Sequence, residues 1–218
     1  MSECLDDFDL PKTLLADVLV HSSDAGAALC ALVAAHRRDY LSGNVLKLEG
    51  DEAGSVFLVL SGWLLASKSL AGGQRQIVDV ILPGGMLHPL SADLSTSALD
   101  VETLTDSRIA LIPWRDWRRA SDAHPELAEL SRKANAASNA RIAERVLRLG
   151  KAPAETMIGF VLCELCLRSS GESLVDGAEF HVPMTQQQLG DVCGLSAVHV
   201  CRTLRRLERN EVLSVTDH

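Results

Sequence analysis

Residues 185–208 have the sequence "TQQQLGDVCGLSAVHVCRTLRRLE", and this stretch decides the fold expected of the C-terminal part. Thr185, followed three residues later by Gln188, forms a capping-box pattern, so a helix is predicted to begin here. Gly194 can adopt the left-handed conformation that ends a short helix. Ser196 is a favourable N-cap for the next helix. Two short helices joined by a turn that contains glycine predict a helix-turn-helix.

The second of these helices is predicted to have one apolar and one basic face. Its apolar face repeats at i, i+4 and i+7 and consists of Val200, Leu204 and Leu207. The opposite face sets four arginines against the single acid Glu208, namely Arg202, Arg205, Arg206 and Arg209. A locally basic helix attracts a phosphate backbone, so the pattern favours DNA binding. The alternative is a solvated amphipathic helix with an arginine run.

The whole chain is acidic, with a net charge of −8, but the distribution of its charges is compatible with a DNA-binding helix. Residues 1–125 hold 10 basic and 17 acidic residues, whereas residues 183–218 hold four of each. The acidic excess therefore lies in the N-terminal half. It argues against binding polyanions without sequence preference, not against a site-specific reader.

Length and composition indicate a folded chain without a membrane span. Of the 218 residues 47% are apolar, which is ample for a hydrophobic core, and no run of about 18 apolar residues occurs. The N-terminal "MSECLDDFDLPK" lacks the pattern of a secretory signal, and six cysteines without a signal favour reduced thiols. We therefore expect a cytoplasmic protein with no membrane partner.

Residues 39–113 alternate short apolar runs with turn signals such as "SGN", "LAGGQRQ" and "LPGG". The runs "SVFLVLSGWLLAS" and "QIVDVILPGG" are typical of strands with glycine at the corners. Evenly spaced short strands predict a small barrel or sandwich.

The spacing of the apolar residues then changes to threes and fours, and this pattern predicts one long helix over residues 124–150. Its apolar stripe includes Leu127, Leu130, Ala134, Ala137 and Ile142. Several basic residues lie off this stripe, among them Arg141 and Arg145. A narrow stripe on a long helix suits a helix–helix seam, so we predict a homodimer. The alternative is a long helix packed on its own β domain. The following "GKAP" indicates a hinge.

The order of these parts resembles the Crp/Fnr family of bacterial transcription regulators. The resemblance rests on "KLEGDEAGSVFLVLSGWLL", "RQIVDVILPGG", "LGKAPAETMIGFVLCELCLR" and the helix-turn-helix itself. It implies an α+β fold. A cyclic-nucleotide-binding-like β-roll of the jelly-roll type would serve as sensor domain (1–124), followed by a dimerisation helix and hinge (125–150) and a winged-helix DNA-binding domain (151–218).

The same resemblance implies the function of a transcription regulator that binds a palindromic double-stranded DNA operator as a homodimer, with RNA polymerase as a candidate partner. The family's base-reading positions fall on Ala197, Val198 and Arg202, and the common Arg-Glu pair is absent. Arg202 alone keeps a long donor suited to guanine. Thr185 and Gln186 match the phosphate-contacting start of the first helix. The predicted DNA-binding set is completed by Ser196, His199, Arg205, Arg206 and Arg209. For His199 a surface role is the alternative.

Two departures from the family pattern follow. After "LERNEVLSVTDH" the sequence stops where the family continues through a β-hairpin wing, so we expect a truncated wing with at most one strand at 213–215. The stretch 82–104, which matches the family's phosphate cassette, contains no arginine or lysine, and Glu102 lies beyond the expected position. A buried phosphate without a cation is costly, so control by cAMP is not expected. The hydroxyls of Ser95, Thr96 and Ser97 could bind a ligand or simply satisfy a turn.

The cysteines do not indicate a cofactor. An iron–sulfur cluster near the N-terminus would need more ligands than Cys4 and Cys30. Cys163 and Cys166 are interpreted as buried packing residues on one helix face. Cys201 lies beside Arg202 on the DNA-facing side, so it is the candidate redox site. We expect no cofactor and no metal.

No paired nucleophile and base and no glycine-rich phosphate loop occur, so an enzyme is not expected. The remaining alternative is a ligand-binding or protein-interaction module of the same fold with weakened or lost DNA binding. It is favoured by Ala197, Val198 and the missing wing.

Overall fold

The computed structural model describes residues 22–52, 54–90, 95–170 and 179–216. Two four-stranded antiparallel sheets form a β-roll, as the resemblance predicted. One sheet has the order β1-β8-β3-β6, built from β1 (Arg37–Tyr40), β8 (Ser107–Pro113), β3 (Ser55–Ser61) and β6 (Met86–Leu87). The other has the order β2-β7-β4-β5, built from β2 (Val45–Lys47), β7 (Asp100–Thr103), β4 (Leu64–Ser69) and β5 (Arg75–Ile81).

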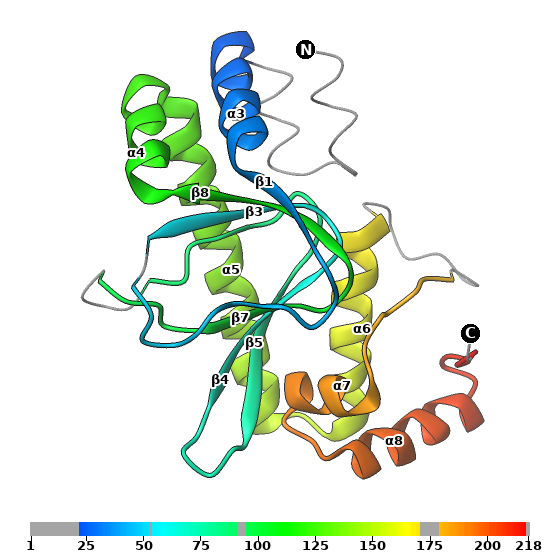
Figure 1. Ribbon diagram of the computed structural model, residues 1–218. Coiled ribbons are helices and arrows are strands. Elements are labelled where there is room, and N and C mark those ends of the chain that lie inside the picture. Colours follow the sequence, from blue (N-terminus) through cyan, green and yellow to red (C-terminus); the bar gives the residue numbers. More distant parts are fainter. Residues whose placement is uncertain (1–21, 53, 91–94, 171–178, 217–218) are drawn as a thin grey trace.

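The helices lie at two ends of the roll (Figure 1). At one end are α3 (Ser23–His36) and α4 (Trp114–Ala123). The long helix α5 (Pro125–Lys151) runs from that end along the roll to the other, where α6 (Ala154–Ser170), α7 (Gln186–Cys193) and α8 (Ala197–Arg209) form the C-terminal part. In the described part of the chain, no helix has the length and apolar character needed to cross a bilayer.

The interior of the roll is an apolar layer between the two sheets. Side chains that alternate along the strands meet there, because successive residues of a strand point to opposite faces. The buried members are Phe57, Val59, Leu64, Ala66, Ile81, Val101 and Ile109.

A second core joins the start of α5 to the same chain's own β-roll. Trp117 of α4 is buried in it, and its indole Nε1 donates to Ser131 Oγ at 2.9 Å. Leu127 and Leu130 are 0% and 2% exposed there, beside residues of α3, β3 and β8. The prediction that these two leucines form a dimer seam is therefore wrong, because their side chains are already used by a single chain.

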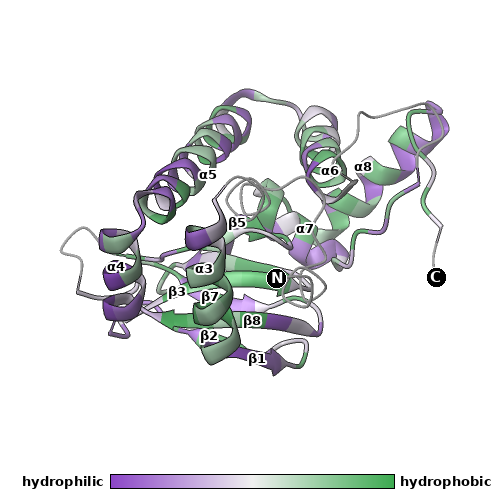
Figure 2. Ribbon diagram, turned by 90° about the horizontal axis from the view of Figure 1, so that it is seen from above, coloured by the Kyte–Doolittle hydropathy of each residue, from purple (hydrophilic) through white to green (hydrophobic). Residues whose placement is uncertain are grey.

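The exposed face of α5 lies elsewhere on the helix. Ala134, Ala137 and Ile142, the other predicted seam residues, are only half-buried. Hydrophobic and hydrophilic residues alternate along α5 (Figure 2). Among the exposed residues of α5, four that are spaced by three and four are small or apolar, namely Ala136, Ala140, Ala143 and Leu147. Polar side chains flank them, namely Arg132, Lys133, Asn135, Asn139 and Glu144.

A third core joins the C-terminal helices to the sheet that contains β4 and β5. Leu65, Ile77 and Val80 of that sheet share a buried cluster with residues of all three C-terminal helices, among them Val161, Val192 and Val200. The C-terminal part is thus packed on the roll through apolar side chains as well as linked by α5.

A group of buried charges lies between β5, α5 and α6. Asp79 of β5, with a side chain 3% exposed, accepts from Ser138 Oγ at 2.9 Å and from Arg141 Nη2 at 2.8 Å. Arg145 is equally buried and reaches Glu164 of α6 at 2.9 Å. Arg168 of α6 donates to Glu164 at 2.8 Å and to the carbonyl of Val80 at 2.6 Å. We call these five ionised residues (Asp79, Arg141, Arg145, Glu164 and Arg168) the buried charge cluster. The sequence pattern had placed both α5 arginines off the packed stripe, and here the structure differs.

Candidate nucleic-acid interface

The start of α7 has the predicted cap. Thr185 Oγ1 accepts from the backbone N–H of Gln188 at 3.1 Å, and the Thr185 N–H donates to Gln188 Oε1 at 2.9 Å. Both halves of the capping box are therefore present, and they satisfy two backbone N–H groups that have no partner within the helix. The cap uses the Thr185 hydroxyl, whereas the neighbouring Gln186 side chain is exposed.

The turn between the helices depends on two glycines. Gly194 ends α7 in the left-handed conformation, with φ +66°, as predicted. Gly190 was not singled out from the sequence. A Cβ there would lie 2.4 Å from the carbonyl oxygen of Leu195, so only glycine lets the turn close against α7. The sequence signal that could have identified Gly190 is its small size, because the other buried positions of α7 carry larger side chains.

Helix α8 begins after Ser196, whose Oγ accepts from the His199 N–H at 3.3 Å. Val200 and Leu207 are buried as predicted, and Leu204 is half-buried. Thr203 is also buried, which the apolar pattern alone did not indicate. His199 is exposed.

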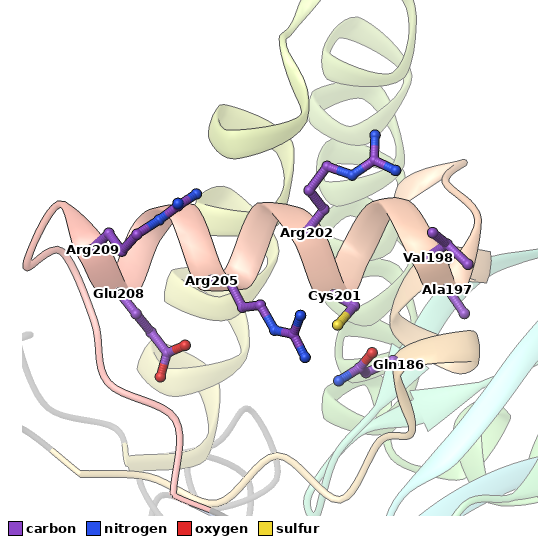
Figure 3. A pocket seen from close by; sticks show the side chains of 8 residues that line it. All are labelled: Gln186, Ala197, Val198, Cys201, Arg202, Arg205, Glu208 and Arg209. Carbon is purple, nitrogen blue, oxygen red and sulfur yellow. The ribbon is translucent and has the colours of Figure 1, made fainter.

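The outer face of α8 lines an open groove of about 880 Å³. Figure 3 shows the lining side chains, which project from α8 and from the start of α7: Gln186, Ala197, Val198, Cys201, Arg202, Arg205, Glu208 and Arg209. Six of these eight were predicted to contact DNA, and Cys201 was the candidate redox site. Val198 is 68% exposed, which leaves its methyl groups open to a partner.

The four arginines of α8 differ in whether they form an ion pair. Arg202, Arg205 and Arg209 are exposed, and the described part of the chain offers them no ion pair. Arg206 instead pairs with Glu155 of α6, and it does not line the groove. Three guanidinium groups are therefore free to meet phosphate or base edges, while the fourth ties α8 to α6.

The free cysteines differ in their surroundings. Cys193 is buried in the third core, and burial raises the pKa of its thiol to about 12. Cys201 is half-buried and lines the groove. Cys166 is buried as expected, but Cys163 is exposed, so the pair does not share one packed face.

The expectation that all thiols are reduced is not met at Cys30, which is disulfide-bonded in the structure. Cys4 lies outside the described residues. Among the described residues no three histidine, cysteine or acidic side chains are grouped as a metal site would require.

Two polar groups of the cassette region, the Ser97 hydroxyl and the Glu102 carboxylate, have partners within the roll. Ser97 is buried and donates its hydroxyl to the carbonyl of Leu99 at 2.6 Å, so this hydroxyl satisfies a turn. His88 packs its ring on Trp114, with centroids 4.5 Å apart, and burial lowers the pKa of its imidazole. Glu102 pairs with Arg75 at 2.5 Å.

The segment after α8 contains no strand within its described residues, Asn210 to Thr216. The backbone N–H of Val215 instead donates to Glu208 Oε1 at 3.0 Å. Residues 213–215 thus do not form the single wing strand that the sequence had left open.

Two family models match the chain. The cyclic nucleotide-binding domain matches residues 37–124, and the Crp-like helix-turn-helix domain matches residues 140–218. The chain thus joins a β-roll of the cyclic nucleotide-binding type to a Crp-like helix-turn-helix.

Transcription regulators are among the proteins to which this chain is similar in sequence. The nitrogen fixation regulation protein FixK of Rhizobium meliloti is 26% identical over 178 residues, which are 82% of this chain and 78% of the relative. The transcriptional activator protein anr of Pseudomonas aeruginosa is 25% identical, over 81% of this chain and 72% of the relative. The solved structure of FixK2 from Bradyrhizobium japonicum has a TM-score of 0.74 at 23% identity and covers 84% of this chain and 88% of its own; it supports the fold. The chain belongs to the Crp/Fnr family of transcription regulators.

Proposed function

We propose that this regulator binds a palindromic DNA operator as a homodimer and that cAMP does not control it. The observation that carries the proposal is the groove on α8, where Arg202, Arg205 and Arg209 are exposed without ion-pair partners among the described residues. An arginine that is not neutralised within its own chain keeps its full charge and all its N–H donors for DNA. The sensor domain (1–124), dimerisation helix and hinge (125–150) and DNA-binding domain (151–218) are part of this proposal.

Within the groove we assign base reading to Arg202 and backbone contacts to Arg205 and Arg209. Arg202 lies one turn from the start of α8, where a recognition helix meets base edges. Val198, on the preceding turn, is suited to a thymine methyl group. Arg209 lies at the end of α8, where such a helix leaves the groove and meets phosphates. Gln186, at the first turn of α7, supplies a further donor toward the backbone.

Dimerisation is assigned to the exposed face of α5. Its alanines at 136, 140 and 143 leave room for a second helix to approach closely, and Leu147 extends the same face. Since Leu127 and Leu130 are occupied, the predicted seam moves around the helix to this face. A two-fold dimer selects an inverted repeat with half-site centres roughly 10 bp apart.

The lack of control by cAMP is supported from two sides. The described cassette has no cation for a phosphate, and Ser97 is used by its own loop. In addition, the side of β5 that faces α5 is filled by the buried charge cluster, whose arginines already have carboxylate partners. Calorimetry should therefore show no micromolar binding of cAMP or cGMP.

The proposal is tested by selecting DNA from a random duplex pool with the purified full-length protein and by sedimentation of the same protein. An inverted repeat and a dimer at micromolar concentration are expected. Recovery of no sequence above background would favour the second candidate, an interaction module of the same fold, for which Ala197 and Val198 at two reading positions are the supporting observation. RNA polymerase as a partner stays a prediction of the resemblance, and a cytoplasmic location stays a prediction from the N-terminal sequence and the cysteines.

A further inference from the structure

Two polar contacts join the β4–β5 hairpin to the helix-turn-helix outside the shared apolar core. Arg75 Nε donates to Asp191 Oδ2 at 3.2 Å, and Gln76 Nε2 donates to the carbonyl oxygen of Val192 at 3.0 Å. The two donors are the first residues of β5, and the two acceptors belong to the last turn of α7. We call these two contacts the hairpin clamp.

Both residues of the Arg75–Asp191 ion pair are partly buried and held by further contacts. The side chain of Arg75 is 26% exposed and that of Asp191 13%, so the ion pair is shielded from much of the solvent. Arg75 is also held by Glu102 of β7 through Nη1 at 2.5 Å, and Asp191 accepts at its other oxygen from Gln187 at 2.8 Å. Each partner therefore has a second contact that fixes its orientation.

The hydrogen bond from Gln76 also satisfies a backbone group at the C-terminal end of α7. The last carbonyls of a helix have no partner within the helix, and the carbonyl of Val192 is one of these. Gln76 supplies a donor from another domain. The adjoining turn is equally close to the rest of the molecule, because a Cβ at Gly194 would lie 2.8 Å from Leu149 Cδ2 at the end of α5.

The clamp leaves the reading surface open. In Figure 1 helix α7 lies between the hairpin and α8, so the clamp and the groove are on different sides of the helix-turn-helix. None of the groove residues takes part in the clamp. The contact thus fixes the orientation of α7 and α8 without covering the side chains that meet DNA.

We propose that Arg75 and Gln76 are positioning residues for operator recognition, which set the half-site spacing that the dimer accepts. This inference rests on the proposed function. In a dimer the second half-site is bound intramolecularly, and its effective concentration is highest when the two reading helices are held at the matching separation. A looser helix-turn-helix still binds one half-site equally well, but it loses affinity for the matched pair and tolerates altered spacers.

The test compares full-length Asp191→Asn with full-length Glu49→Gln. Each variant removes one negative charge that pairs with a cation of the β4–β5 hairpin, Arg75 in the first case and Lys68 in the second. Only Asp191→Asn breaks an ion pair between the hairpin and the helix-turn-helix, because both partners of the Lys68–Glu49 pair lie in the roll. Gln76→Ala, which removes the other contact without a change of charge, is the second test variant. Thermal unfolding of each variant confirms that it is folded.

Affinities are measured by fluorescence anisotropy on duplexes derived from the inverted repeat selected by the wild type: a single half-site, the matched repeat, and repeats with one or two base pairs added to the spacer. We expect Asp191→Asn and Gln76→Ala to bind the matched repeat about 5-fold more weakly, a size typical of two partly exposed pairs per dimer. Each affinity is divided by that for the single half-site, so that the effect of the lost charge of Asp191 cancels. The loss of both variants on lengthened spacers should be smaller than that of the wild type. Glu49→Gln should keep the spacer preference.

Unchanged spacer preference in both clamp variants would overturn the inference, as would an equal change in Glu49→Gln. If the wild type selects no DNA at all, the proposed function fails instead, so the two failures are distinguishable.

Discussion

Two groups of three arginines in this chain have opposite surroundings. Arg141, Arg145 and Arg168 belong to the buried charge cluster, with side chains between 3% and 24% exposed. Arg202, Arg205 and Arg209 project from α8 into solvent. The first group is matched by Asp79 and Glu164, whereas the second has no ion pair in the described part of the chain.

The difference follows from the cost of burying charge. A guanidinium taken out of water must recover its hydration from carboxylates and carbonyls, so the buried arginines are committed to β5, α5 and α6. An exposed guanidinium bears no such cost and keeps its donors for a ligand. The buried group therefore stabilises the arrangement of domains, and the exposed group serves recognition.

The largest effect is expected from Asp79→Ala, which leaves three arginines facing one carboxylate. Breaking a buried pair by removing one partner costs about 3–5 kcal/mol. Urea denaturation should show a fall in the free energy of unfolding of that size. The matched control is Asp39→Ala, whose carboxylate pairs with Arg108 at the surface and whose loss should change the free energy of unfolding little, because solvent screens the pair. Equal effects of the two substitutions would remove the distinction between the groups.

The same carboxylate predicts a dependence of stability on pH. Burial by itself would raise the pKa of Asp79, but the hydrogen bond from Arg141 and the charges of Arg168, Arg141 and Arg145 outweigh it and hold the pKa below its ordinary value of 3.8. A lowered pKa in the folded state means that the stabilisation is complete above 3.8 and is lost as the pH falls through the folded-state pKa. The melting temperature of the wild type should therefore fall more steeply below pH 4 than that of Asp79→Asn. Parallel curves would assign acid sensitivity to other groups.

Among the exposed arginines, Arg202→Ala should have the largest effect on DNA. We expect a loss of about 1–3 kcal/mol per half-site and relaxed preference at one base pair, most readily a guanine. Titration of matched and base-substituted operators measures both. A uniform loss with base preference intact would show that Arg202 contacts only the backbone.

The thiols sharpen the same contrast between buried and exposed positions. Mild oxidant should lower operator affinity by about tenfold through Cys201, because a larger, polar sulfur would lie in the groove among the arginines. Cys201→Ser should be resistant. Cys193→Ser is the matched control, since the raised pKa of Cys193 leaves it little reactive thiolate at neutral pH and its sensitivity should stay that of the wild type. Equal loss in Cys201→Ser would point to another thiol.

The smallest effect is expected from Arg209→Ala. It should weaken binding to all sequences alike and make the slope of log affinity against log salt shallower by about one unit for each phosphate that the protein no longer neutralises. Arg206→Ala is the control, because Arg206 pairs with Glu155 and should leave that slope unchanged. A shallower slope in Arg206→Ala would mean that its ion pair opens on DNA.

The helix-turn-helix was the part of the molecule most open to prediction. The cap at Thr185, the left-handed Gly194 and the buried Val200 and Leu207 all lie within a stretch of 24 residues. Interactions between residues three or four positions apart need no other part of the fold, so they can be recognised from local sequence alone.

The surfaces that cover each element could not be predicted in the same way. The stripe with Leu127 and Leu130 was correctly recognised as apolar, but the structure buries both residues in their own chain and leaves Ala136 and Ala140 exposed. Asp79 looked like the polar residue of an ordinary strand, and nothing near it in the sequence announced three arginines 62 to 89 positions away.

The sequence by itself therefore determined the identity of the parts: a β-roll, a long helix and a helix-turn-helix whose outer face is basic. Only the tertiary structure decided which arginines are free, which face of α5 is open, and that Arg75 reaches Asp191 across 116 positions of the chain. The physical reason is that periodicity records how much of an element's face is apolar. Which neighbour covers that face, and which charges are neutralised there, depends on contacts between segments far apart in the sequence.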